Sequence, residues 1–182
     1  MITIKTEKEI KVMAEGARML AGVVEKLKKQ ARPGITTNEL DRLAESLILK
    51  LGAKCNFKGE DNFPSCICAS VNEQIVHAVP SERVLKEGDI LSLDLGLLWK
   101  GFHTDMAVTL PVGKISFEAQ RLLRVTKKAL SRGIKKSKAG NTFGDIGETI
   151  QRYVESQGFN VVRDLCGHGI GRKLHELSLI HI

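Results

Sequence analysis

Two aspartates in the middle of this 182-residue sequence are the first residues whose spacing suggests chemistry. Apolar and polar residues alternate from Asp89 to Leu110, and the break at Trp99-Lys100-Gly101 predicts a β-hairpin. A turn at Trp99-Lys100 places Asp94 directly opposite Asp105, with Cβ atoms about 4.5–5.5 Å apart. Two carboxylates this close share a proton or bind cations, and two-metal hydrolytic sites use such pairs. The alternative is a polar, solvated face on which each aspartate lies near a lysine.

A histidine between two glycines, in Cys166-Gly167-His168-Gly169-Ile170-Gly171, is the second signal. The glycines free the backbone on both sides, so the His168 ring can closely approach an ion or a substrate. His175 follows shortly after, and His77 is predicted to lie at the end of an apolar strand within residues 65–79, just before a turn. The alternative for each histidine is a packing role. A nucleotide loop is disfavoured because the full G-x-G-x-x-G spacing is absent, and no G-x-S-x-G nucleophile motif occurs.

Four helices and the hairpin must position these residues. Apolar residues recur at three- and four-residue steps from Glu7 to Gln30, and Thr6 with Glu9 forms a predicted capping box. Three more helices are predicted: about 38–51 with Thr37 as its cap, about 117–138, and about 143–157. In the hairpin, the core face is predicted to hold Leu91, Leu93, Leu95, Leu97, Phe102, Met106, Val108 and Leu110.

The two helix pairs are similar at an offset of 106 residues, which brings Gly34, Thr36 and Gly52 onto Gly140, Thr142 and Gly158. The apolar positions keep the same phase, so we infer an internal repeat. We therefore predict one domain over residues 1–182, with halves of about 1–113 and 114–182. The second half would need strands to about residue 216, so we expect it to be incomplete.

The composition, 42% hydrophobic and 27% charged, is that of an ordinary globular chain. No apolar run approaches the roughly 20 residues of a membrane span, and no secretory signal opens the sequence. We therefore predict a cytoplasmic protein without membrane contact. The net charge is +7, but the densest basic runs, 26–29 and 135–138, fall at predicted helix C-termini. Solvated helix ends are favoured there over a nucleic-acid patch.

The four cysteines, Cys55, Cys66, Cys68 and Cys166, are predicted to be reduced thiols, as is usual in the cytoplasm. Cys66 and Cys68 form a C-x-C, but no second pair stands at zinc-finger spacing. On a strand the two would point to the same face, and we expect both simply to pack.

Taken together, these residues resemble the bacterial methionine aminopeptidases, from about Thr6 to Glu176. The resemblance implies the mixed α/β (α+β) pita-bread fold, in which two pseudo-symmetric halves surround one metal site. The pieces that carry it are Ser70-Val71-Asn72-Glu73 with His77, Gly88-Asp89-Ile90 through Asp94, Gly101-Phe102-His103-Thr104-Asp105, and Gly167-His168-Gly169-Ile170-Gly171 with His175-Glu176.

The resemblance also implies roles for individual residues. Asp94, Asp105 and His168 are implied ligands of two divalent metal ions (Mn, Fe, Co or Zn), with Asp105 bridging them. His77 and His175 are the implied catalytic histidines, and Phe63 and Cys68 the implied lining of the methionine pocket. The implied reaction removes the N-terminal Met of nascent polypeptides, with the ribosome surface as a further expected contact and a monomer as the expected state.

Two further glutamate ligands of the family would lie beyond Ile182, so we expect a C-terminally truncated form with weak metal binding and little or no activity. Two other functions are considered. One is a proline-specific peptidase of the same superfamily, which usually has a separate N-terminal domain. The other is a non-catalytic pita-bread protein that binds peptides or nucleic acid, although such relatives typically lose the ligands that Asp94, Asp105 and His168 provide here.

Overall fold

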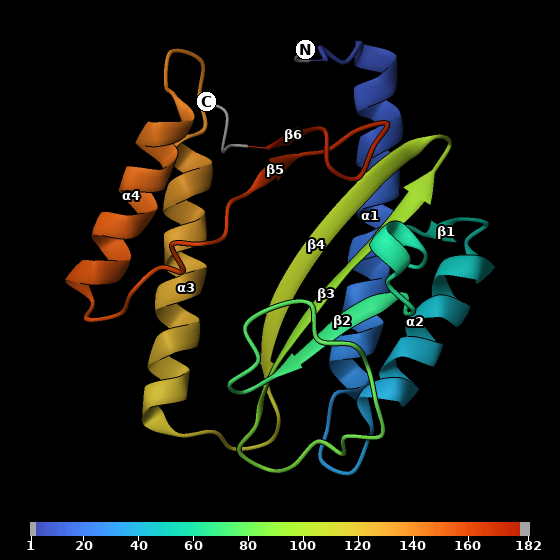
Figure 1. Cartoon of the computed structure of the whole chain (residues 1–182), viewed down its shortest axis with the longest axis vertical. Helices are drawn as coiled ribbons and strands as arrows, with labels where there is room; N and C mark the ends of the chain where they lie inside the picture. The colour runs from blue at the N-terminus through green and yellow to red at the C-terminus, as the bar shows by residue number, and fades with distance from the viewer. Residues whose placement is uncertain (1–2, 179–182) are drawn as a thin grey trace. The chain divides into compact units, whose positions relative to one another are not determined.

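The computed structural model describes residues 3–178, which divide into two compact units (Figure 1). Unit 1 comprises residues up to 115 together with 169–177, and unit 2 comprises residues 116–168 with 178. The expectation that the chain ends within an incomplete half concerns residues 179–182 and beyond, outside the described residues. Within residues 3–178, no helix combines the length and apolar character needed to cross a membrane.

Unit 1 begins with the helices α1 (Glu7–Gln30) and α2 (Thr37–Lys50). The predicted capping box of α1 is present: the Thr6 hydroxyl accepts from the Glu9 N–H, and the Glu9 carboxylate accepts from the Thr6 N–H. The cap of α2 is Thr36, with Glu39 at the third helical position, so the prediction of Thr37 is wrong by one residue. Thr37 is buried instead and exchanges hydrogen bonds with the Ser81 backbone.

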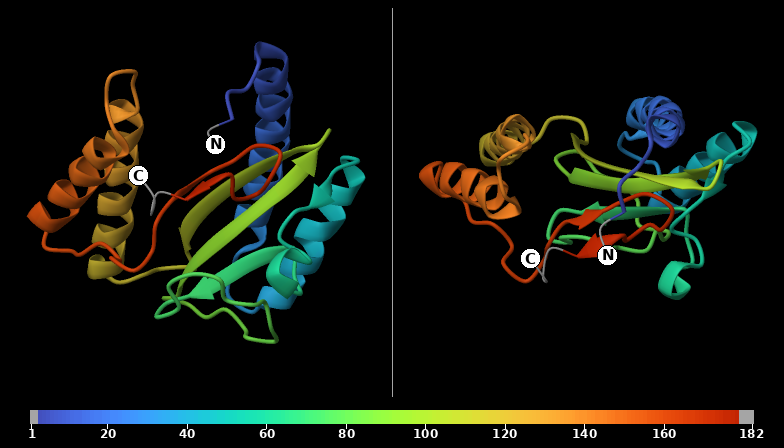
Figure 2. Two further views of the ribbon diagram at one scale, coloured as in Figure 1. Left: turned by 45° about the horizontal axis from the view of Figure 1, so that its top comes forward. Right: turned by 90° about the horizontal axis from the view of Figure 1, so that it is seen from above.

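The sheet of unit 1 is built around one long strand, β3 (Ile90–Trp99). Along one edge of β3 lie β1 (Lys54–Cys55) and β2 (Ile67–Val71), and along the other lies β4 (Phe102–Pro111), all antiparallel to it. The 3-10 helix η1 (Glu60–Asn62) lies in the connection between β1 and β2. The helices α1 and α2 lie on one side of the sheet (Figure 2).

The core of unit 1 fills the space between the helices and the sheet. The odd-numbered leucines of β3 are fully buried, as predicted, and oppose Leu110, Val108, Met106 and Thr104 of β4. Met106 is an exception among the predicted core residues, because 40% of it is exposed. The largest fully buried side chains are Leu20, Leu27, Leu40, Ile48, Ile67, Leu85, Leu91, Leu93, Leu95 and Leu97. This packing holds the opposite face of β3 in a fixed position.

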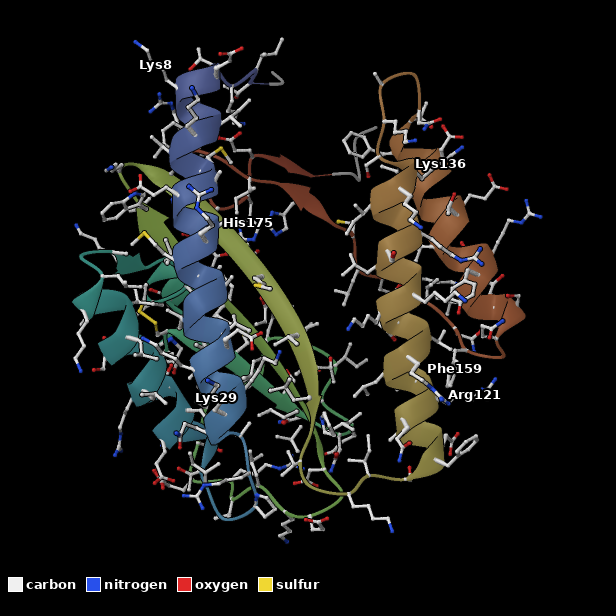
Figure 3. All side chains as sticks on the ribbon, turned by 180° about the vertical axis from the view of Figure 1, so that it is seen from behind. Lys8, Lys29, Arg121, Lys136, Phe159 and His175 are labelled. Carbon is white, nitrogen blue, oxygen red and sulfur yellow. A yellow bond between two sulfur atoms is a disulfide. The ribbon has the colours of Figure 1, made fainter. Side chains whose placement is uncertain are left out.

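Unit 2 contains the helices α3 (Phe117–Lys136) and α4 (Phe143–Ser156). The end of α3, both ends of α4 and the turns repeat those of unit 1 at the inferred offset, whereas α3 starts four residues later than the offset predicts. α4 has the length of α2, its Thr142–Asp145 capping box corresponds to Thr36–Glu39, and Gly140 and Gly158 have φ of 90° and 76° against 94° and 73° for Gly34 and Gly52. The helices pack through Val125, Ala129 and Val154. Arg121 stacks on Phe159, 4.7 Å from its ring centre (Figure 3).

The cysteines differ from the prediction. Cys55 and Cys66 form a disulfide, with Cα atoms 5.2 Å apart (Figure 3), so the prediction that all four are reduced is wrong. Cys66 belongs to the main core, whereas Cys68 packs in a separate apolar cluster, so the two do not share a face as predicted. The reason is that Cys66 precedes β2 and comes beside Cys55 only through the pairing of β1 and β2 with β3, a contact that sequence spacing does not reveal.

Candidate functional site

Asp94 and Asp105 lie on the same face of the β3–β4 hairpin but are not directly opposite each other. Asp94 opposes Ala107, and Asp105 opposes Gly96. The predicted register is therefore wrong by two residues. The cause is the turn, in which Lys100 and Gly101 have φ of 47° and 82° and form a two-residue connection between the paired Trp99 and Phe102. The first of the two turn positions usually holds Asn, Asp or Gly in a turn of this type. Lysine at position 100 gives no sequence signal for it.

The corrected register makes the two aspartates diagonal neighbours, which are typically about 7–8 Å apart, with Cβ atoms somewhat closer than that. This spacing leaves more room for a cation between the carboxylates than direct opposition would. Gly96 lies on the same face, two residues after Asp94 and directly opposite Asp105. A Cβ there would come within 2.5 Å of Asn56 Oδ1 and 2.3 Å of the Thr104 carbonyl oxygen. Asp94 is half-buried, and Asp105 is exposed.

Asn56 is a buried polar residue that sequence reasoning missed. Its Nδ2 donates to the Thr104 carbonyl oxygen at 3.0 Å, next to Asp105 in the chain. Its Oδ1 is buried and has no hydrogen-bond partner among the described residues. This oxygen lies close to Gly96, which opposes Asp105, and carboxylate and amide oxygens are donors that suit divalent cations.

An apolar cluster lies beside Asp94. Cys68 opposes Asp94 across the β2–β3 pair and packs with buried Phe57 and Leu174 and with the partly buried Phe63 and Ile170. The structure therefore brings together the two predicted pocket residues, Phe63 and Cys68. Burial first, and then the charges of Asp94, Asp105 and Asp41, raise the pKa of the Cys68 thiol to about 12. A neutral thiol behaves as a small hydrophobe, so this wall of the cluster is apolar.

His175 lies at the edge of this cluster, adjoining Leu174. Its Nδ1 is 3.7 Å from Glu60 Oε1, and both side chains are about half exposed. His103, which was not predicted as a site residue, is half-buried nearby, and its backbone N–H donates to the Gly171 carbonyl oxygen at 2.7 Å. Burial lowers the pKa of His103, against the opposing charges of Glu60 and Glu176. A neutral imidazole at this position remains available for hydrogen bonding.

A cavity of about 440 Å³ adjoins Asp105 within unit 1. Its walls come from the N-terminal half of α1, from β4 and from the 169–177 segment, and the lining residues are Lys5, Ile10, Met13, Ala14, Ala17, His103, Thr104, Asp105 and Ile170. Hydrogen-bonded ion pairs fix the 169–177 segment in place: Lys5 with Glu176, and Arg172 with Glu9 at 2.6 Å. The cavity size is within the range of small-ligand sites.

His77 lies in the segment after β2 and not in a strand as predicted, because β2 ends at Val71. Its φ is 57°, and its side chain is exposed. The next residue, Ala78, holds the segment beside β2: its carbonyl oxygen accepts from the Ala69 N–H at 3.0 Å, and its N–H donates to Ser70 Oγ. His77 therefore lies alongside the strand that carries Cys68.

His168 begins the short strand β5 (His168–Gly169), which pairs with β6 (Leu177–Ser178), and it is exposed in unit 2. Among residues 3–178, no three His, Cys, Asp or Glu side chains are grouped closely enough to hold a metal ion. The carboxylate pair of unit 1 is thus the part of the predicted ligand set whose arrangement can be described.

Comparison with known proteins places these features in context. Residues 11–182 match the model of metallopeptidase family M24. The chain is 49% identical to the methionine aminopeptidase of Clostridium perfringens over 176 residues, which cover 97% of this chain and 71% of that protein.

Solved structures give the same result. The methionine aminopeptidase of Rickettsia prowazekii superposes with a TM-score of 0.96 at 34% identity, over 98% of this chain and 73% of that one. The Xaa-Pro dipeptidase of Bacillus anthracis superposes with a TM-score of 0.83 at 29% identity, over 95% of this chain and 48% of that one. The predicted mixed helix-and-strand fold is therefore confirmed.

Proposed function

Since this chain belongs to metallopeptidase family M24 and its relatives at 38–49% identity are methionine aminopeptidases, we propose that it removes the N-terminal methionine of nascent polypeptides at the face of β3 and β4 that carries Asp94 and Asp105. The observation that supports this most is the adjacency of two unlike environments in unit 1. A pair of carboxylates lies next to an apolar cluster, and we propose that this face binds a cation and the apolar methionine side chain side by side.

The residues that hold metal in this proposal are Asp94, Asp105 and His168. The carboxylate oxygens of the hairpin fit a divalent ion, as does the nearby Asn56 Oδ1, which has no hydrogen-bond partner within residues 3–178. Two ions drawn from Mn, Fe, Co or Zn are proposed. His168, in unit 2, is proposed as a ligand on the resemblance alone. Bound divalent metal would lower the pKa of a water molecule and polarise the scissile carbonyl.

The other residues bind and orient the peptide. Phe63 and Cys68, with Phe57 and Leu174, are proposed to enclose the methionine side chain in the apolar cluster. His77, beside β2, is proposed to contact the substrate. His175 is proposed to donate a hydrogen bond where negative charge develops on the carbonyl oxygen, with Glu60 near its Nδ1 restricting the ring.

The test is metal binding and Met release by Asp105→Asn and Asp94→Asn, with Glu25→Gln as a control that removes one charge from an exposed pair. We expect each site variant to bind Mn²⁺ at least about tenfold more weakly by calorimetry, and to lose Met release from a Met-Ala peptide. Unchanged Mn²⁺ affinity in both variants would contradict the proposal.

Proline-specific cleavage is the second candidate, because a proline dipeptidase shares the fold at 29% identity. The methionine enzymes are closer in sequence, at 34–42% for two solved structures, and the Phe63–Cys68 cluster accommodates a flexible apolar chain. Comparing release from Met-Ala and Ala-Pro peptides distinguishes the two, and faster Ala-Pro cleavage would favour the alternative.

We also propose a cytoplasmic, monomeric enzyme that contacts the ribosome through α3. This helix holds one acidic residue, Glu118, and seven basic residues: Arg121, Arg124, Lys127, Lys128, Arg132, Lys135 and Lys136. Such an excess of positive charge attracts RNA phosphates, and this attraction weakens as the salt concentration rises. Co-sedimentation with ribosomes should fall for Lys127→Ala/Lys128→Ala but not for the α1 control Lys8→Ala/Lys11→Ala, and equal binding of both would contradict the contact.

A further inference from the structure

The disulfide closes the neck of a loop. Strands β1 and β2 follow one another along the same edge of β3, where Cys55 opposes Leu97 and Ile67 opposes Leu95. The chain therefore leaves this edge at Cys55 and returns at Cys66, after an excursion over residues 56–65. The two Cα atoms are 5.2 Å apart, within the usual range for a disulfide. We call residues 56–65 the site loop.

The site loop contacts three parts of the proposed active site. Asn56 holds the Thr104 carbonyl oxygen, immediately before Asp105. Phe57 and Phe63 form part of the apolar cluster, and Glu60 lies 3.7 Å from His175. The position of the loop therefore affects a proposed metal ligand, the methionine pocket and a proposed catalytic histidine at once.

The backbone within the site loop is unusual. Asp61 and Asn62 have φ of 45° and 63°, and Gly59 has φ of 92°. Consecutive left-handed residues that are not glycine are costly and persist only where the surroundings enforce them. The backbone bonds from the Gly59 N–H to the Phe63 oxygen (2.8 Å) and from the Phe63 N–H to the Glu60 oxygen (2.7 Å) hold the tip. The ion pair of Lys58 with Glu45 Oε1 at 2.6 Å restrains the loop as well, and the covalent link at the neck is a further restraint.

We propose that Cys55 and Cys66 form a reversible thiol–disulfide site, oxidised by small-molecule disulfides such as glutathione disulfide, whose state sets the order of the site loop and the affinity for the methionine side chain. The choice of methionine as the ligand rests on the proposed function, whereas the effect of the disulfide on the order of the site loop does not. Reversible exchange also gives the disulfide a role in a cytoplasmic protein, where an exchangeable pair is more usual than a permanent one.

The exchange proceeds in two balanced steps. The thiolate of half-buried Cys55 attacks one sulfur of the reagent disulfide, whose S–S bond breaks and releases one thiol, which takes up the proton. The thiolate of Cys66 then attacks the Cys55 sulfur of the mixed disulfide and releases the second thiol. The protein loses two electrons and two protons, and the reagent gains them. Cys66 is in place for the second step because its N–H donates to Asp41 Oδ1 at 2.8 Å.

The first experiment measures the link and the loop in the full chain. After oxidation with glutathione disulfide, peptide mapping should join Cys55 to Cys66, and dithiothreitol should break the link. Exposed Lys58 lies within the site loop and reports its order through tryptic cleavage. We expect cleavage after Lys58 to be about tenfold faster in the reduced chain. Cys55→Ser should be cleaved at the fast rate in both conditions, whereas the control Cys166→Ser should behave as the unaltered chain.

The second experiment measures L-methionine affinity by calorimetry in both states. We expect the affinity to be at least about threefold higher in the oxidised chain, and Cys55→Ser to have the reduced value throughout. Equal cleavage rates after Lys58, a stable mixed disulfide without the Cys55–Cys66 link, or equal methionine affinity in the two states would each overturn the redox proposal. Absence of methionine binding in both states, with the cleavage difference intact, would instead count against the proposed function.

Discussion

Cys68 shows how one residue acquires its character from its neighbours. It is buried against Phe57 and Leu174, and it opposes Asp94 across the sheet. Burial, and then the nearby carboxylates, raise the pKa of its thiol to about 12, so the thiolate is essentially absent at neutral pH. We infer that Cys68 acts as an apolar pocket wall and not as a nucleophile.

This assignment predicts selective alkylation. Iodoacetamide at pH 8 should modify exposed Cys166 and leave Cys68 unmodified in the folded chain, with both modified after unfolding. Peptide mass spectrometry measures both sites in one sample. The control is Asp94→Asn: because a carboxylate disfavours a neighbouring thiolate, removing its charge should lower the pKa of Cys68 while burial still holds it above the ordinary value of 9.0. Rapid modification of Cys68 in the folded chain would contradict the assignment.

The candidate site could be predicted from the sequence only where a residue type carries its own signal. Asp94, Asp105, Phe63, Cys68 and the histidines were identified by spacing or by resemblance. Asn56, Leu174 and His103 were not, because their importance arises from contacts between segments distant in the chain. The Cys55–Cys66 disulfide was missed for the same reason, since only strand pairing shows that the two thiols meet.

At the scale of elements, Gly96 determines how closely the site loop packs on the hairpin. Gly96→Ala would place a Cβ 2.3 Å from the Thr104 oxygen and 2.5 Å from Asn56 Oδ1, and one of these contacts is with backbone. We expect a loss of about 1–3 kcal/mol in the free energy of unfolding, measured by urea denaturation.

Gly22→Ala is the matched control. Gly22 lies inside α1, and a Cβ there would meet nothing within 4 Å. Alanine has the higher helix propensity, so this variant should gain up to about 1 kcal/mol. If Gly96→Ala had the same free energy of unfolding as the unaltered chain, the contact between the site loop and the hairpin would be loose enough to admit a Cβ, which would contradict the close packing at Gly96.

The elements themselves were largely predictable, since apolar periodicity and capping residues located all four helices and the hairpin. Register was not. A lysine with positive φ at position 100 shifts the pairing by two residues, and nothing in its residue type indicates this. The cap of α2 was missed by one residue because Thr36 and Thr37 are adjacent and equally suitable.

At the scale of the whole molecule, the two units have very different cores. The core of unit 1 joins two helices to a four-stranded sheet, whereas that of unit 2 is built on Val125, Ala129 and Val154 between two helices. Leu130 and Ile134 of α3 are 59% and 64% exposed, while Val24, at the position of α1 equivalent to Leu130, is 1% exposed. The repeat thus conserves helix bounds without conserving burial.

We therefore expect unequal local stability. Amides of α3 and α4 should exchange with solvent with protection factors at least about tenfold lower than those of α1 and β3, because few buried apolar contacts oppose their opening. Hydrogen exchange followed by mass spectrometry measures this in a single experiment. Equal protection in the two units would show that α3 and α4 are stabilised by contacts beyond their own small core.

The carboxylates of the capping boxes make the first turns of α1, α2 and α4 sensitive to acid. Hydrogen bonds from the Thr6, Thr36 and Thr142 backbones lower the pKa values of Glu9, Glu39 and Asp145, so their caps stabilise the helices above the ordinary carboxyl pKa and lose this effect as pH falls through the lowered values. α3 has no such carboxylate, because Ser116 caps it with Ala119 at the third position. Acidification to a pH below the ordinary carboxyl pKa should thus fray the starts of α1, α2 and α4 together while leaving the start of α3 intact, and amide exchange at these four positions would record it.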